Sequence, residues 1–161
     1  MKSSLRKLQL GLVFAAVAAF TAGAWAQDSD AIAGTWKLNV AKSKFKPGPA
    51  PKSMTLKIEA AGKGVHLTSE GVGADDKPIA TEYTANYDGK EYPLKGSPVA
   101  DTVSLKRMGP RTVRRTDKKD GKVVQTLTRV IDKDGKSFTV TTKGKNAKGE
   151  PVDNVTVFEK Q

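Results

Sequence analysis

The stretch KVVQTLTRVIDKDGKSFTVTTKG, residues 122–144, contains two runs rich in β-branched side chains on either side of a polar turn. The runs, 122–131 and 136–144, have the length and composition of β-strands. Between them lies Asp134-Gly135, a dipeptide that favours tight hairpins because glycine tolerates a positive φ. The stretch therefore predicts two antiparallel strands joined by a short turn.

The same pattern continues in both directions along the chain. Further β-rich runs, each bounded by Gly, Asp, Asn or Pro, are 33–40, 53–60, 64–70, 79–87, 90–94, 101–108, 111–117 and 152–160. Asp88-Gly89 and Asp120-Gly121 predict two more hairpins. No run of ten or more residues after residue 26 has the i, i+3, i+4, i+7 apolar spacing of an amphipathic helix. Successive strands are therefore expected to be antiparallel neighbours, with little helix.

A meander of this kind leaves two unpaired edge strands, and closing the sheet into a barrel removes them. We therefore expect an all-β fold, an antiparallel up-and-down meander of about 8–10 strands closed into a β-barrel. The segment Lys42–Lys52 contains Pro47, Pro49 and Pro51, which exclude a helix or a central strand and predict an extended connection. Closure would also enclose an interior.

Residues 1–26 have the pattern of an export signal. The pattern consists of Lys2, Arg6 and Lys7, the apolar run Leu8–Thr21 and the small-x-small tripeptide Ala24-Trp25-Ala26. Cleavage before Gln27 would leave a single domain, residues 27–161, and would lower the formal net charge from +11 to +8 because three basic residues are lost. The apolar run is too short for a spanning helix. We expect a periplasmic or secreted protein with no transmembrane segment after cleavage.

The composition excludes several kinds of chemistry. The chain has no cysteine, which excludes disulfides, thiolate catalysis and zinc–cysteine sites. Its single histidine, His66, cannot form a two-histidine metal site, and no nucleophile-elbow motif accompanies it. Residues 132–135 are interpreted as a hairpin turn rather than a calcium loop, which would sit between helices. We therefore expect no catalytic residue, no metal and no cofactor, and hence a protein that is not an enzyme.

Period-two alternation suggests which side chains face the interior. In the run 79–87 the inward set is expected to be Ile79, Thr81, Tyr83, Ala85 and Tyr87. In the run 122–131 one face carries Val123, Gln125, Leu127, Arg129 and Ile131, and the other carries Val124, Thr126, Thr128 and Val130. Neither face is purely apolar, so both assignments stay open: Arg129 either is a solvated surface residue or lies inside, where a buried guanidinium needs a carboxylate or a bound anion.

Three segments together resemble the calycin superfamily of lipocalin-like barrels, and especially its fatty-acid-binding branch. These segments are Gly34-Thr35-Trp36-Lys37-Leu38, Leu127-Thr128-Arg129-Val130 followed by Asp134-Gly135-Lys136, and Val157-Phe158-Glu159-Lys160-Gln161. The resemblance implies a lipocalin-like barrel around a ligand cavity, with Trp36 packed across its floor and Arg129 in the place of a family arginine. The opening of the domain is also similar to that of many exported bacterial proteins of unknown function.

The chain departs from this branch at two places. The family's helix-turn-helix lid has no counterpart, because Lys42–Lys52 occupies its position. The Arg-x-Tyr that holds a ligand carboxylate in the last strand is replaced by Thr156 and Phe158. The resemblance therefore supports the fold better than it supports a particular ligand.

Two functions follow as hypotheses. The leading one is an exported, non-enzymatic protein that binds a small apolar or amphipathic ligand, expected to be an anion. Its expected ligand-binding residues are Trp36 at the floor, Tyr83, Tyr87, Leu127 and Phe138 along the walls, and Arg129 with Gln125 as the anchor for a polar head. The alternative is an interaction protein that binds anionic envelope polymers or lipid head groups through a basic outer face.

The basic outer face of the alternative comes from one dense run of cations. Its residues are Lys106, Arg107, Arg111, Arg114 and Arg115. The run lacks the aromatic side chains on which single-stranded nucleic acids stack, so nucleic acid is not expected as the working partner. The same cations would also be typical of edge strands that are protected from aggregation by charge.

Overall fold

The computed structural model describes residues 31–161, and the predicted export signal lies outside the described residues. This part of the chain forms ten strands. They are β1 (Gly34–Lys44), β2 (Ser53–Ala61), β3 (Gly64–Val72), β4 (Pro78–Asn86), β5 (Asp88–Pro93), β6 (Thr102–Gly109), β7 (Thr112–Lys119), β8 (Lys122–Ile131), β9 (Ser137–Lys145) and β10 (Pro151–Lys160). Within residues 31–161 only Ala31 and Ile32 are helical. In the same range no helix is long and apolar enough to span a membrane.

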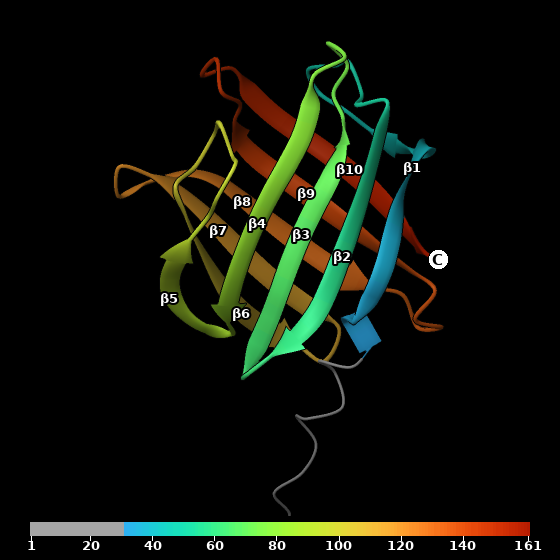
Figure 1. Cartoon of the computed structure of the whole chain (residues 1–161), viewed down its shortest axis with the longest axis vertical. Helices are drawn as coiled ribbons and strands as arrows, with labels where there is room; N and C mark the ends of the chain where they lie inside the picture. The colour runs from blue at the N-terminus through green and yellow to red at the C-terminus, as the bar shows by residue number, and fades with distance from the viewer. Residues whose placement is uncertain (1–30) are drawn as a thin grey trace, which may run out of the picture.

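The strands form one antiparallel sheet in the order β4-β3-β2-β1-β10-β9-β8-β7-β6-β5. The first and last strands are paired in the middle of this order, and the sheet curls into a nearly closed barrel (Figure 1). The predicted all-β meander with little helix is therefore confirmed. Its predicted turns at residues 120–121 and 134–135 are confirmed as well, with a φ of +72° at Gly121 and +68° at Gly135.

The predicted hairpin at Asp88-Gly89 is wrong. Strands β4 and β5 follow each other in the sequence but form the two opposite edges of the sheet. Gly89, with a φ of +77°, lies inside β5, where the pairing with β6 shifts between Asp88 and Glu91. The dipeptide thus bends an edge strand instead of making a two-residue turn.

The barrel closes between these two edges through a single bridge. The Glu82 amide donates to the Lys95 carbonyl at 3.1 Å, and the Lys95 amide donates to the Glu82 carbonyl at 2.9 Å. Because the bridge lies beyond the end of β5, the two strands themselves are not paired along their length. This seam keeps the barrel short of complete closure.

The pairing of β1 with β10 is interrupted between Asn39 and Lys44, which alternation alone does not predict. Its pairing with β10 moves from Asn39↔Val157 to Lys44↔Val155, and Val40, two residues after buried Leu38, is 39% exposed. The hydroxyl of Ser43 compensates for the interrupted ladder, since it donates to the Asn39 carbonyl at 2.7 Å and accepts from the Val157 amide at 2.9 Å.

Glu159 of the neighbouring strand β10 stabilises this irregular part of β1. Its Oε1 accepts from Lys42 Nζ at 2.8 Å and from Asn39 Nδ2 at 3.0 Å. These hydrogen bonds hold the pKa of Glu159 below its usual value, chiefly through Lys42 and then through Asn39. A lowered pKa means that the carboxylate stabilises the fold above its unfolded-state pKa and that this stabilisation is lost as the pH falls through the folded-state pKa.

The variant Glu159→Gln should therefore melt at a lower temperature than the parent protein at neutral pH and at the same temperature in strong acid. The expected difference is small because the ion pair is exposed. Thermal unfolding followed by circular dichroism over a pH series measures it, with Glu70→Gln on β3 as the control. A difference that persists below the pKa range of carboxylates would show that charge at Glu159 is not the cause.

The two ends of the barrel are closed differently. At one end Trp36 is fully buried, and its Nε1 donates to the Ile32 carbonyl at 2.9 Å. Its ring meets Phe138 edge to face at 4.7 Å between centroids, and Phe138 stacks on Phe158 at 5.1 Å. These aromatic rings form a packed floor.

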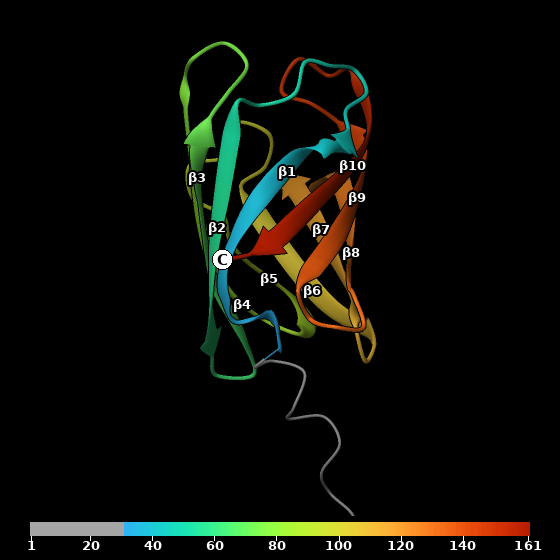
Figure 2. The ribbon, with the colours of Figure 1, turned by 90° about the vertical axis from the view of Figure 1, so that its right-hand side faces the viewer.

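The other end is crossed by the proline-containing connection between β1 and β2, here called the strap, residues 45–52 (Figure 2). The strap contains neither helix nor strand, as its prolines predict. It is tied at its start, where the Lys46 amide donates to Asn154 Oδ1 at 2.8 Å and its carbonyl accepts from the Asp153 amide at 2.8 Å. At its end the Lys52 amide donates to the Val72 carbonyl at 2.9 Å.

Candidate functional site

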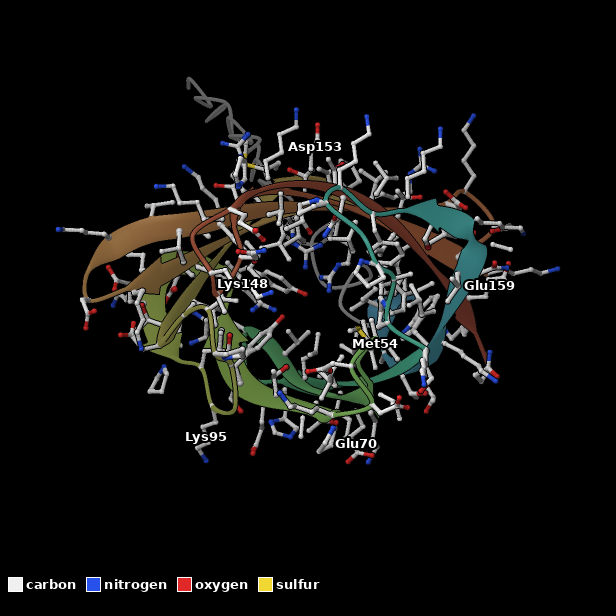
Figure 3. The ribbon with its side chains drawn as sticks, turned by 90° about the horizontal axis from the view of Figure 1, so that it is seen from above. Met54, Glu70, Lys95, Lys148, Asp153 and Glu159 are labelled. Atoms are coloured by element: carbon white, nitrogen blue, oxygen red, sulfur yellow. The ribbon has the colours of Figure 1, made fainter. Side chains whose placement is uncertain are left out.

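The barrel encloses a cavity of about 310 Å³ between the aromatic floor and the strap. Every strand except β5 contributes to its lining. The apolar and aromatic lining residues are Leu38, Phe45, Pro51, Met54, Leu56, Leu67, Ile79, Tyr83, Leu105, Val113, Leu127, Phe138, Val140 and Phe158, and the polar ones are Ser69, Thr81, Arg115, Gln125, Arg129, Thr142, Asn154 and Thr156. Figure 3 looks into the barrel from the strap end, with Met54 beside the hollow and Glu70, Lys95 and Glu159 at the outer rim. The lining is mainly apolar with a few polar groups, which is typical of small-molecule sites.

The structure decides which face of β8 points inward. Gln125, Leu127 and Arg129 line the cavity, whereas Val130 is 41% exposed. The reason is the register, which places Arg129 beside Val113 of β7 and Val140 of β9, and both of these also line the cavity. Arg129 is therefore an interior residue and not a solvated surface residue.

Arg129 reaches the cavity near its aromatic floor with an incomplete set of partners. Its Nη2 donates to the Tyr87 hydroxyl at 3.3 Å, a long hydrogen bond, and its guanidinium carbon lies 6.0 Å from the centroid of the Phe138 ring. Its Nε is buried and has no hydrogen-bond partner among the described residues. A buried N–H group of a charged side chain without an acceptor is costly, so this position favours an acceptor supplied by a ligand.

Arg115 enters the cavity from β7 and has an internal partner. Its Nε donates to Asp117 Oδ1 at 2.6 Å and its Nη2 donates to Asp117 Oδ2 at 2.8 Å, while its guanidinium carbon lies 4.8 Å from the centroid of the Tyr83 ring. Burial acts to lower the pKa of Arg115, but the electrostatic interactions with Tyr83 and Asp117 outweigh burial, so the pKa is raised above its ordinary value. Arg115 is therefore a charged group whose charge is already balanced.

Among residues 31–161, these two arginines are the only charged side chains in the lining of the cavity. One of them, Arg115, is neutralised by Asp117, which is 3% exposed. The other, Arg129, has no carboxylate within ion-pair distance among the described residues. The cavity thus presents one uncompensated positive charge.

The remaining polar groups are largely engaged with the protein itself. Ser69 Oγ and Thr81 Oγ1 hydrogen-bond each other at 2.6 Å, and Thr156 Oγ1 donates to the Val140 carbonyl at 3.3 Å. Gln125 Nε2 donates to the Lys145 carbonyl at 2.7 Å.

Gln125 and Arg129 are not brought together as a single anchor. They lie four residues apart on β8, which separates their Cα atoms by about 13 Å at the rise of a strand. Gln125 instead turns toward Lys145 at the end of β9. A carboxylate bound at Arg129 would therefore accept hydrogen bonds from Arg129 and not from Gln125.

The other sequence-predicted residues separate into two groups. Tyr83, Leu127 and Phe138 line the cavity, where the leading hypothesis places them. Trp36 and Tyr87 do not line it, but each supports a residue that does: Trp36 packs behind Phe138, and Tyr87 holds Arg129.

The predicted basic outer face needs correction. Arg115 points inward, and Arg107 lies on the same side of β6 as buried Leu105, with its guanidinium carbon 4.5 Å from the centroid of the Tyr87 ring. Lys106 and Arg114 face each other across β6 and β7 and remain exposed, and Arg111 is exposed in the turn between the two strands. The physical reason is alternation, since adjacent cations in a strand point to opposite faces of the sheet.

Sequence reasoning missed Arg115 and Asp117 as interior residues. The signal was present in the run 111–117, where Val113, Arg115 and Asp117 occupy alternate positions and therefore share a face. An arginine and an aspartate two residues apart on the face of a buried valine indicate an internal ion pair. The ion pair was missed because all cations of the run were interpreted as one surface patch.

No metal site is evident in the described part of the chain, since residues 31–161 contain no cluster of three or more His, Asp or Glu side chains. His66 Nδ1 and Thr84 Oγ1 hydrogen-bond each other at 2.8 Å across β3 and β4. Residues 132–135 form the turn between β8 and β9, closed by a hydrogen bond from the Gly135 amide to the Asp132 carbonyl at 3.1 Å.

Comparison with known proteins supports the fold. The structure is similar to the crystal structure of zebrafish ileal bile acid-binding protein complexed with cholic acid, with a TM-score of 0.50 and 13% sequence identity. The similarity covers 81% of this chain and 99% of the zebrafish chain. No family model and no curated protein matches the sequence. At this level of identity the likeness shows a shared β-barrel fold alone and says nothing about the ligand.

Proposed function

We propose that this protein is a non-enzymatic binding protein that holds a small amphipathic anion inside its barrel. One observation carries the proposal: the buried, partnerless Nε of Arg129 in an otherwise mainly apolar cavity. An anionic head group would supply the missing acceptor and the missing negative charge together. The apolar lining would take up a hydrocarbon portion, at about 25 cal/mol for each Å² removed from water.

The positions of the lining residues suggest how such a molecule lies. Arg129 is close to the aromatic floor, beside Phe138. Leu127 comes two residues before Arg129 in β8, and Phe45 and Met54 lie at the strap end of the cavity. The head would therefore sit deep and the chain would point toward the strap. A volume of about 310 Å³ lies near the lower limit of small-molecule sites, roughly 300 Å³, which favours a small single-chain ligand.

The proposed export and the proposed absence of an enzymatic role rest on observations outside the cavity. Export to the periplasm or beyond rests on the sequence pattern of residues 1–26 alone. The absence of an enzymatic role is consistent with the fold of a bile acid-binding protein, which in its crystal structure holds a small amphipathic molecule. We propose no cofactor and no metal for the binding reaction.

Native mass spectrometry of the exported protein is the first test. The expected result is a mature chain that begins at Gln27 and carries a discrete adduct, which is released on denaturation. A copurified anion would identify the ligand class directly. A chain that retains residues 1–26 in the exported fraction would contradict the cleavage site.

A titration with defined probes tests the anion requirement itself. Decyl sulfate is expected to bind at one site per chain and at least about tenfold more tightly than 1-decanol, because only the sulfate offers a charged acceptor to Arg129. Binding of the sulfate should change little between low and moderate salt, since the contact is buried. Equal affinity for the two probes, or binding that disappears at moderate salt, would contradict the cavity proposal, and the second outcome would favour the outer basic face.

A further inference from the structure

The interior ion pair Arg115–Asp117 is not used by the proposed binding reaction, although Arg115 lines the same cavity. Asp117 is 3% exposed, and both of its carboxylate oxygens accept from Arg115 in a two-pronged arrangement. This is the geometry with which an arginine grips a carboxylate ligand. Asp117 therefore already uses the Nε and Nη2 donors of Arg115 that an acidic group of a ligand would otherwise use.

We propose that Asp117 is a specificity-determining residue that limits the cavity to ligands with a single negative charge. The inference rests on the proposed function, since it concerns which anions the same cavity accepts. Asp117 neutralises Arg115 and accepts its hydrogen bonds, so a second anionic group of a ligand finds no free positive charge there. The ligand class is thereby narrowed to single-chain monoanions such as alkyl sulfates or monocarboxylates.

The register of the strands shows why a second charge would otherwise fit. Arg115 on β7 is opposite Leu127, and Arg129 on β8 is opposite Val113, so the two arginines are diagonal neighbours on the inner face of the sheet. Diagonal neighbours have Cα atoms about 7–8 Å apart, within reach of two long side chains that approach one head group. With Asp117 absent, the cavity would offer two uncompensated guanidinium groups to one ligand.

A dianionic ligand has no good position in the cavity as it stands. Its second charge would have to displace Asp117 from Arg115, which would leave a buried carboxylate without its partner and place two like charges side by side. Tyr83, 4.8 Å from the guanidinium carbon, further occupies one side of Arg115. Discrimination of this kind works by exclusion, since the wrong ligand meets a repulsive group.

Two probes with the same chain test the proposal. Decyl sulfate carries one negative charge, and decyl phosphate at mildly alkaline pH carries about two, because the second pKa of a phosphate monoester is about 6. Titrations are performed with the full mature protein below the micelle concentration of each probe. The parent protein is expected to bind decyl sulfate at least about tenfold more tightly than decyl phosphate.

The variant Asp117→Asn should reverse or abolish this preference. The amide keeps the shape of the carboxylate but removes its charge, so the ratio of the two affinities should shift by at least about tenfold toward decyl phosphate. The matched control is Asp153→Asn, an exposed aspartate of β10 that pairs with Lys143. It makes the same change in net charge outside the cavity and should leave the ratio as it is.

A second pair of variants keeps the test valid if Asp117→Asn does not fold. Arg115→Gln leaves Asp117 as an uncompensated anion beside the cavity and should weaken decyl sulfate binding by at least about tenfold through repulsion. Adding Asp117→Asn to Arg115→Gln removes that anion and should restore binding. Binding of 1-decanol should change little in both variants, whereas a merely structural role of the ion pair would weaken the binding of both probes together.

The outcomes separate this inference from the proposed function. If decyl sulfate binds in a manner that depends on Arg129, but neither the change in ratio nor the rescue is observed, Asp117 does not determine specificity and this inference is overturned. If neither probe binds the parent protein, the proposed function fails first. A preference for decyl phosphate in the parent protein would overturn the single-charge limit directly.

Discussion

Replacement of Trp36 by alanine is expected to lower the free energy of unfolding by about 3–5 kcal/mol, the usual loss for a buried tryptophan. Trp36 is fully buried, it packs edge to face on Phe138, and its Nε1 is bonded to the Ile32 carbonyl. Alanine would leave a cavity under the aromatic floor and an unpaired carbonyl. Since a domain has only about 5–15 kcal/mol of stability in total, this single change should bring the barrel close to unfolding.

Urea denaturation followed by far-ultraviolet circular dichroism measures this effect, because the change removes a tryptophan and compromises fluorescence as a probe. Val40→Ala on the same strand is the control. Val40 is 39% exposed, so its truncation should cost no more than about 0.5 kcal/mol. A loss below about 1.5 kcal/mol for Trp36→Ala would show that the floor can collapse around the missing ring, contrary to the packing described here.

Replacement of Arg129 by methionine is expected to weaken decyl sulfate binding by about 2–4 kcal/mol, which corresponds to roughly 30-fold to 1,000-fold in affinity. Methionine approximates the length of the arginine stem but has no N–H donors and no charge. The anionic head would then be buried without a partner. Binding of 1-decanol should hardly change, because its chain contacts the same apolar lining.

Stability should respond in the opposite direction. The free protein keeps the Arg129 Nε buried without an acceptor, so its removal should leave the free energy of unfolding unchanged or increase it. Arg114→Met is the matched control, since Arg114 lies on the outer face of β7, opposite Thr128 of β8. Calorimetric titration and urea denaturation of the two variants measure both effects. If Arg129→Met binds decyl sulfate like the parent protein, Arg129 is not the anchor.

The strand pattern was predictable because it depends on neighbours in the sequence. Each predicted run from 53–60 to 152–160 corresponds to a strand of the barrel, and Gly121 and Gly135 make the expected turns. The hairpin at Asp88-Gly89 was not predictable, because the same dipeptide also suits a bend within an edge strand. The dipeptide makes a hairpin turn only if β4 and β5 pair with each other. The order of all ten strands in the barrel determines that they do not, because β4 and β5 are its two edge strands.

The candidate site was predictable only in part. Tyr83 and Phe138 were found as lining residues because alternation places them with apolar neighbours, whereas Leu127 shares its face of β8 with Arg129 and depended on the same open choice. Arg129 stayed ambiguous because both faces of its strand mix polar and apolar side chains. Arg115 was misplaced because a dense run of cations was interpreted as one surface patch, although alternate residues of a strand point to opposite faces.

The sequence by itself determined the class of fold, the number and limits of most strands and the residues that share a face, since these follow from period-two alternation and from the local conformations of glycine and proline. Tertiary structure alone decided that β8 presents Arg129 inward and that Arg129 keeps a buried donor without an acceptor. Those facts arise from the register between strands and from the closure of the barrel. They depend on contacts between segments distant in the chain, and no local pattern of residues encodes them.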